Sequence, residues 1–315
     1  MKKRGVAAFV AAAFYVAGSG AASSQALTDF NKMYQDTPSI YASVGVLTMQ
    51  RSRPSGGTTV AGNPGGTPAF RTARDFDFGW NTGIDATVGF RFWRTEALEV
   101  RFMNFETRTS DSFVTPGNFI GAGFTGPGGT SFRGDAETSM QSWEINWRHQ
   151  MSDQFTVLAG VRHINLNDMM FYKLNGNVAT GKYNYQNQLF GAQIGAEWAI
   201  MPVANPFQVN MYGKFGLYNV RTEGGIFEFQ GNNPIGSFTA SERDHVYGAE
   251  GGVTLGYRLS STVMLRAGYQ VMWLNDLGLA GNAASVSLLN PSLLRDVHRT
   301  DIVLQGFNFG MAIAY

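Results

Sequence analysis

The chain alternates apolar and polar residues with a period of two in one segment after another. In the segment FGAQIGAEW, Phe190, Ile194 and Trp198 fall on one face, and Gln193 and Glu197 fall on the other. Successive side chains of a β-strand point to opposite faces, so this period predicts strands with one apolar and one polar face. The pattern recurs at 39–50, 82–93, 97–105, 142–150, 155–166, 188–200, 207–218, 246–258, 263–273 and 307–315, although the faces of 39–50 are mixed and leave its orientation open.

The connections between these segments alternate between short and long. Short turns are expected at 94–96, 149–154, 201–206 and 259–262, and long Gly/Asn/Ser-rich loops at 51–79, 106–137, 167–184, 221–243 and 275–299. Short turns on one side and long loops on the other are typical of bacterial outer-membrane barrels. We therefore expect an all-β fold, a transmembrane up-and-down antiparallel β-barrel of about 10 strands, with about 12 as the alternative. The long loops are expected to be extracellular, and both ends of the barrel are expected on the periplasmic, short-turn side.

A water-soluble β-sandwich or lipocalin-type barrel is the competing fold, and it would turn its apolar face inward. Two observations argue against it. The polar face carries charges in the middle of the strands, and aromatic residues cluster at both ends of the apolar face. These aromatic residues are Trp93, Trp147, Trp198, Tyr257 and Tyr315 at the short-turn ends, and Trp80 and Trp273 at the long-loop ends. Amphipathic rings at both edges of an apolar band are typical of membrane interfaces.

Residues 1–26 have the layout of a secretory signal peptide. The cationic start MKKR is followed by the apolar run GVAAFVAAAFYVAG and then by small residues, with SQA at 24–26 as the expected cleavage site. A membrane anchor is the alternative, but the apolar run is short for a span of about 20 residues. We expect export, a mature barrel domain at 27–315, and a location in the outer membrane of a diderm bacterium.

Composition excludes several functional classes. A net charge of +1 gives no electrostatic basis for nucleic-acid binding, and the absence of cysteine excludes disulfides and thiolate metal sites. The four histidines are scattered without metal-binding spacing, so no catalytic, metal or cofactor site is predicted. Asp244 beside His245 is the one pair that a barrel hydrolase would use, and a solvated dipeptide at the rim is the favoured interpretation.

The chain closes on the alternating segment NFGMAIAY. An open sheet edge is not tolerated in hydrocarbon, so the last strand of a membrane barrel has to pair with the first. The segment also resembles the C-terminal signal by which the barrel assembly machinery recognises its clients. The residues that carry this resemblance are Asn308, Gly310, Ile313 and Tyr315.

Two interior stretches resemble a known family. FTVLAGVRHINLND (155–168) and, after a loop, YQNQLFGAQIGAEW (185–198) are similar to two successive strands of a porin-like outer-membrane barrel family abundant in planctomycetes. FDFGWNTGIDATVGFRF resembles the second strand of that family. His163 stands where the family has an aromatic residue, and Gln186 stands where it has Thr. The resemblance implies a porin-like barrel and brings no ligand or substrate with it.

The polar face supplies the candidate functional residues, because in a membrane barrel of this type it faces the lumen. Seven cationic and five anionic side chains are assigned inward: Arg91, Arg101, Arg148, Arg162, Lys214, Arg258 and Arg266, with Asp85, Glu99, Glu144, Glu197 and Glu250. Such a ladder either lines a pore of weak anion preference or fills the barrel with salt bridges.

The strand count limits the width of the lumen. Barrels of about eight strands are filled by side chains, whereas about 16 to 18 strands leave an aqueous channel. We therefore expect a narrow pore for passive passage of small solutes or ions. A closed structural or surface-interaction barrel that acts through its external loops is the alternative, and a barrel hydrolase is a distant third. Expected partners are outer-membrane lipid, the assembly machinery and small solutes or ions, with no nucleic acid and with homo-oligomerisation left open.

Overall fold

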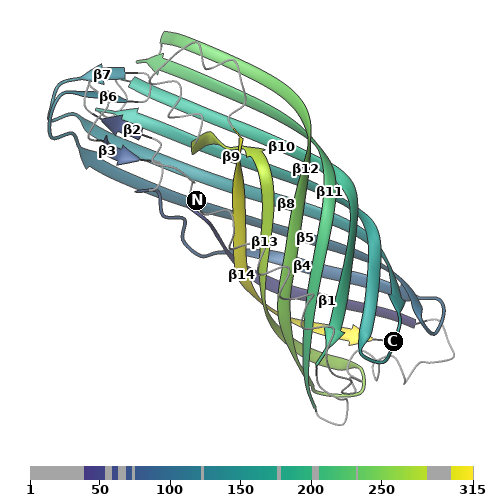
Figure 1. Cartoon of the computed structure of the whole chain (residues 1–315). Coiled ribbons are helices and arrows are strands. Elements are labelled where there is room, and N and C mark those ends of the chain that lie inside the picture. The colour runs from purple at the N-terminus through teal and green to yellow at the C-terminus, as the bar shows by residue number, and fades with distance from the viewer. Residues whose placement is uncertain are drawn as a thin grey trace.

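The structure of the protein is a computed structural model in which ten strands form a closed antiparallel barrel (Figure 1). It describes residues 39–53, 59–62, 69–72, 75–121, 124–175, 179–200, 206–231, 233–281 and 299–314. The expected signal peptide at 1–26 and the terminal Tyr315 lie outside the described residues.

The barrel strands pair in the order β1-β14-β13-β12-β11-β10-β9-β8-β5-β4 and then close on β1. Their bounds are β1 (Ser39–Arg51), β4 (Asn81–Arg91), β5 (Glu96–Val114), β8 (Ser131–Gln150), β9 (Phe155–Leu174), β10 (Ala179–Ala199), β11 (Phe207–Gln230), β12 (Asn233–Arg258), β13 (Val263–Gly278) and β14 (Arg299–Ala314). A separate sheet of order β3-β2-β6-β7 contains β2 (Thr59–Gly62), β3 (Ala69–Thr72), β6 (Phe119–Gly121) and β7 (Phe124–Gly126). The expected all-β barrel is confirmed, with ten strands.

Pairing of β1 with β14 closes the barrel. The register runs from Tyr41 opposite Ala314 to Arg51 opposite Leu304, so neither strand is left with an open edge. The segment 39–50, whose orientation the sequence left open, is therefore the first barrel strand. Its start and the end of β14 lie at the same end of the barrel, as do the short turns at 92–95, 151–154 and 259–262.

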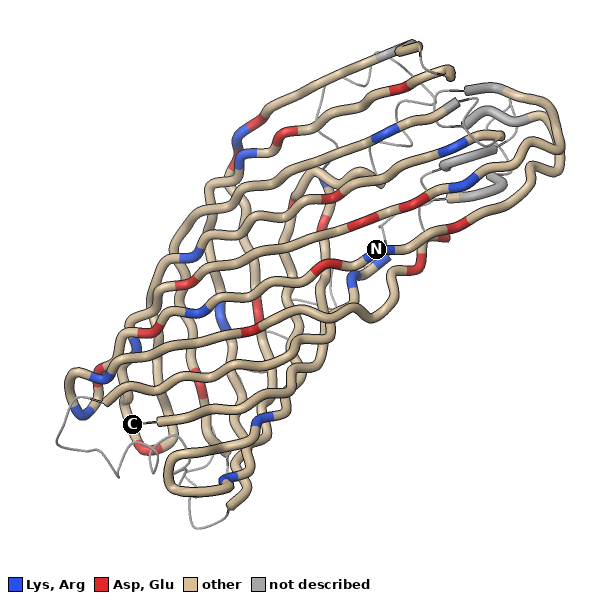
Figure 2. The backbone as a smooth tube through the Cα atoms, turned by 180° about the vertical axis from the view of Figure 1, so that it is seen from behind, with Lys and Arg blue, Asp and Glu red and all other residues tan. Residues whose placement is uncertain are grey.

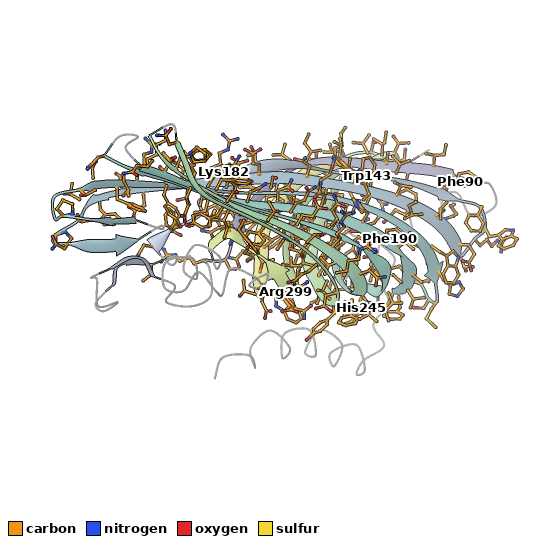
Figure 3. All side chains as sticks on the ribbon, turned by 90° about the horizontal axis from the view of Figure 1, so that it is seen from above. Phe90, Trp143, Lys182, Phe190, His245 and Arg299 are labelled. Atoms are coloured by element: carbon orange, nitrogen blue, oxygen red, sulfur yellow. The ribbon has the colours of Figure 1, made fainter. Side chains whose placement is uncertain are left out.

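The lower half of the barrel, nearest these turns, has an apolar outer surface. Ile194 and Leu217 are 64% and 62% exposed, and Phe90, Trp143 and Phe190 point outward (Figure 3). Along β11 the apolar exterior runs from Phe207 to Leu217. This is roughly 33 Å of strand, and at a tilt of about 40° it spans roughly 25 Å, the height of the apolar band of outer-membrane barrels. We call this surface the apolar belt.

Within the described segments, no helix is long and apolar enough to span a bilayer.

In the upper half of the barrel, away from the short turns, the structure differs from the long loops that the sequence predicted. The long loops expected at 106–137, 167–184 and 221–243 consist largely of strand, because β5, β8, β9, β10, β11 and β12 all continue far beyond the apolar belt. Of the other two expected loops, 51–79 contains β2 and β3, and most of 275–299 lies outside the described residues.

The physical reason is that apolar and polar residues still alternate past the apolar belt, but there the polar residues face outward and the apolar residues face inward. On β9, Val161 points outward and Arg162 inward at the level of the belt, whereas above it Leu166 points inward and Asn165 outward. A strand that has left the lipid faces water on its outer side, so polar residues move outward and apolar residues move inward. In the sequence, those polar outer positions resemble a loop.

The strands end at unequal heights. β5 and β8 to β12 form a tall curved wall, whereas β13, β14, β1 and β4 end lower, and the sheet of β2, β3, β6 and β7 lies at the tall end (Figure 1). An apolar cluster fills the inner side of this wall, with Phe76, Tyr172 and Tyr183 among its most buried members. Burial in this region raises the pKa of Tyr185 to about 12, which keeps its phenol neutral.

Gly89 of β4 allows an aromatic ring of the neighbouring strand β1 to lie against the inner side of the barrel. A Cβ at Gly89 would lie 1.9 Å from Cζ of Tyr41, whose hydroxyl donates to Glu99 Oε2 at 3.0 Å. We expect Gly89→Ala to lower the free energy of unfolding by about 1–3 kcal/mol, because the ring has to move. Urea unfolding in lipid vesicles measures it. Gly79→Ala is the matched control, since a Cβ there meets nothing within 4 Å, and equal effects of both variants would contradict the assignment.

Candidate functional site in the barrel lumen

In the lower half of the barrel, residues of opposite charge lie on neighbouring strands (Figure 2). Several of these side chains form ion pairs inside the barrel. Six of the twelve predicted lumen residues form one buried cluster at mid-height. They are Asp85 on β4, Arg101 on β5, Glu144 on β8, Arg162 on β9, Lys214 on β11 and Glu250 on β12.

Glu250 and Glu144 connect the three cations of this charge cluster. Glu250 lies 2.7 Å from both Arg101 and Arg162. Glu144 lies 2.7 Å from Lys214, 3.4 Å from Arg162 and 3.6 Å from Arg101. Asp85 completes the set with a contact of 2.8 Å to Arg101. Three cations and three anions thus balance one another across the barrel.

Uncharged polar side chains complete the hydrogen bonding of the cluster. The Tyr212 hydroxyl donates to Glu250 at 3.0 Å, Gln193 donates to Glu144 at 2.9 Å, and Asn146 donates to Glu144 at 3.1 Å. These residues were not among the predicted lumen residues, because only charged residues were chosen from the polar face. Their positions on the inward-facing side of the alternating strands would have identified them.

A cavity of about 190 Å³ lies between the charge cluster and the short turns. Arg148 crosses it to Glu99 at 2.7 Å and to Glu197 at 2.5 Å. Arg91 and Arg266 also line it, and Arg266 donates to the Ser43 hydroxyl at 3.2 Å. In all, five basic and four acidic side chains line the cavity, which leaves a surplus of one positive charge there. Arg258, the remaining candidate, lies at the turn end of β12 and does not line the cavity.

An apolar layer lies directly above the charge cluster, and the sequence did not predict it. Its buried side chains are Leu47, Met49, Met103, Phe105, Met140, Ile164, Leu166, Leu189, Tyr218, Val220, Val246, Met272, Leu274, Leu277, Leu279, Ile302 and Leu304. They come from nine of the ten barrel strands and from the segment after β13. Each is at most 4% exposed, so these side chains are buried against one another inside the barrel.

A buried ion pair lies above this apolar layer. Arg51 contacts Asp168 and Thr138, and Thr138 donates to Asp168 at 2.6 Å. The other Asp168 oxygen accepts the backbone N–H of Ala280 at 2.8 Å. The Asn187 side chain both donates to and accepts from the backbone of Gly278, at 2.8 and 3.0 Å. These contacts hold the chain that follows β13 inside the mouth of the barrel.

The predicted assembly signal is only partly described. Asn308 and Gly310 face inward on β14, and Ile313 is exposed on the outer surface. A Cβ at Gly310 would lie 2.3 Å from the Val44 carbonyl oxygen, so Gly310 permits close approach to β1. Tyr315 lies outside the described residues, and the signal stays a prediction.

The pair that a hydrolase would use has a different arrangement. The Asp244 carboxylate accepts the backbone N–H of His245 at 2.7 Å and lies 3.7 Å from Arg299. It therefore does not orient the imidazole as a catalytic dyad requires. Within the described residues, no group of three or more His, Asp or Glu is arranged to hold a metal ion.

The closed sheet, the apolar belt with its aromatic residues and the charged interior define the class. The protein is a transmembrane β-barrel of the outer-membrane type. No protein-family model matches the chain, and no curated protein sequence matches it. The resemblance to the planctomycete porin-like family therefore stays a prediction.

Solved structures with a similar fold are outer-membrane barrels. The outer membrane protease OmpT from Escherichia coli matches 89% of this chain and 97% of its own, at 9% identity and a TM-score of 0.49. The translocator domain of the autotransporter NalP from Neisseria meningitidis matches 98% and 99%, at 11% identity and 0.43. The outer membrane protein OprG from Pseudomonas aeruginosa matches 89% and 96%, at 12% identity and 0.28. Similarity at this level concerns the fold alone.

Proposed function

We propose that the protein is an outer-membrane barrel whose lumen is closed at rest and which acts through the half that extends beyond the membrane. The observation that supports this proposal is the apolar layer, because 17 side chains from nine of the ten strands and the segment after β13 occupy the interior immediately above the charge cluster. Water and ions have no polar path through such a layer. The six long strands extend further than a membrane crossing needs, which provides the surface for interaction.

A narrow pore for small solutes or ions is the second candidate. The cavity between the charge cluster and the short turns favours it, because five basic and four acidic side chains line this part of the lumen and give it a small positive surplus. In this case the apolar layer would have to rearrange before conduction.

For either candidate, we propose that the protein is exported by a cleaved signal peptide at 1–26.

Planar-bilayer recordings separate the two candidates. We expect folded wild-type protein to give no stable conductance steps, while a 16-stranded porin in the same membranes conducts. Small steps with weak anion preference would contradict the closed barrel and favour the pore. In that case Glu144→Gln should raise the anion preference further, since it removes one lumen carboxylate, and removal of the Arg266 charge should lower it.

A further inference from the structure

A groove lies on the outer surface where the apolar belt ends on β9 to β12. Phe190 of β10, Asn219 of β11 and His245 of β12 follow one another across the strands in one row and line it. Phe190 is 59% exposed, and the side chains of Phe190 and His245 project from the outside of the barrel (Figure 3). The groove therefore borders both the lipid-facing surface and the polar surface above it.

Two arginines stand directly opposite each other in the next row above. Arg221 of β11 is in register with Arg243 of β12, and both side chains are exposed on the outside. Directly opposed side chains have Cβ atoms about 4.5–5.5 Å apart, and like charges in this arrangement destabilise a sheet. An anion between two guanidinium groups would remove the repulsion and accept charge-assisted hydrogen bonds from both.

The nearby carboxylates do not occupy that place. Glu223 lies 2.6 Å from Arg221, on the side away from the apolar belt. Asp244 also lines the groove, but it belongs to the inward-facing set of β12 and lies 3.7 Å from Arg299. Within the described part of the chain, no carboxylate is within ion-pair distance of Arg243.

Gln188 of the adjacent strand β10 is in register with Arg221 and carries no charge. The strands β5 and β8, which lie beyond β10 and β9, lack the positive charge as well. Above the apolar belt, the first two outward positions are Asn104 and Glu106 on β5 and Gln141 and Ser139 on β8. The opposed arginines therefore distinguish one sector of the outer surface from the sector beside it.

We propose that this groove binds the phosphorylated headgroup of a lipid in the outer leaflet. Acyl chains lie against Phe190 and Leu217, which belong to the apolar belt. The phosphate lies between Arg221 and Arg243, two residues or roughly 7 Å of strand above Phe190. The Asn219 side chain is placed beside it as a further hydrogen-bond donor. A ligand of this groove needs both an apolar part and an anionic part. A phosphorylated lipid has both, whereas a soluble anion has only the second. This proposal is independent of whether the lumen conducts.

Native mass spectrometry of the full-length protein in non-ionic detergent tests the proposal, with lipid A that carries both phosphates as the probe. We expect Arg221→Gln/Arg243→Gln to weaken retention of this lipid about thirtyfold, which corresponds to about 2 kcal/mol at about 1 kcal/mol for each arginine near an anionic lipid surface. Asn219→Asp, which adds an anion and keeps both arginines, should weaken it as well. Both variants alter exposed side chains, and a heat-modifiable band on gels verifies their fold.

The matched control removes another directly opposed basic pair. Arg133 of β8 is in register with Lys173 of β9, far above the apolar belt. Arg133→Gln/Lys173→Gln makes the same change in charge and should leave retention within threefold of wild type. Equal losses in both double variants would overturn the site in favour of general electrostatics.

Further outcomes overturn the proposal in other ways. Equal retention of lipid A after removal of its phosphates would show that acyl chains alone bind. Displacement of the lipid by millimolar inorganic phosphate would assign the arginines to a soluble anion. A dimer that dissociates in Arg221→Gln/Arg243→Gln would assign the groove to a second copy of this chain.

Discussion

Replacement of Glu250 by Gln should lower the free energy of unfolding by about 3–5 kcal/mol, the range found when one partner of a buried ion pair is removed. The Glu250 side chain is 1% exposed and lies 2.7 Å from both Arg101 and Arg162. The neutral amide leaves two buried guanidinium groups with one excess positive charge in the interior. Urea unfolding in lipid vesicles, followed by tryptophan fluorescence, measures the loss.

Two further variants make this result specific. Glu106→Gln removes one partner of an exposed pair with Arg108 and should cost less than about 1 kcal/mol. Glu250→Gln combined with Arg162→Met removes both partners of one pair and should recover part of the loss, because no buried charge is left over. A Glu250→Gln protein as stable as wild type would mean that the charge cluster is open to water.

Deletion of Tyr315, or Tyr315→Asp, should abolish insertion into the outer membrane and leave export across the inner membrane intact. The last strand pairs with both β13 and β1, so a barrel whose last strand is not recognised and placed during assembly stays open on two sides. An open edge in hydrocarbon costs several kcal/mol for each unpaired backbone group. The terminal aromatic residue is also the last element of the predicted assembly signal.

Fractionation of cells that produce the variant measures this effect, with heat modifiability as the assay for folded barrel. Asp301→Asn is the control, since it changes an exposed residue at the far end of the same strand. Wild-type amounts of heat-modifiable protein in the outer-membrane fraction without Tyr315 would contradict the assembly signal.

The lower half of the barrel could be predicted from the sequence because lipid imposes one rule on every strand. Each outer position must be apolar, so the alternation alone assigns Arg101, Arg162 and Glu250 to the other face. Which of these side chains meet could not be predicted. Arg101 and Glu250 are 149 residues apart, and their contact depends on strand register, tilt and barrel closure together. A one-residue shift of register would have given other partners.

The upper half was mistaken for loops because the rule changes where the strands leave the lipid. On β5 the inward positions pass from Glu99 and Arg101 to Met103 and Phe105, while the outward positions become polar. The sequence contains this exchange, since the period of two is unbroken. The exchange is overlooked only if the same face of a strand is assumed to stay apolar along its whole length. The apolar layer inside the barrel was missed for the same reason.

This exchange of faces divides each long strand into two environments with opposite substitution rules. Along β9, a polar residue in place of Val161 would meet hydrocarbon, whereas a polar residue in place of Leu166 would meet the core of a structure surrounded by water. Tolerated substitutions should therefore change face between these two positions, although the backbone continues without a break. The lower part of the strand should therefore follow the substitution rules of a membrane protein, and the upper part those of a water-soluble domain.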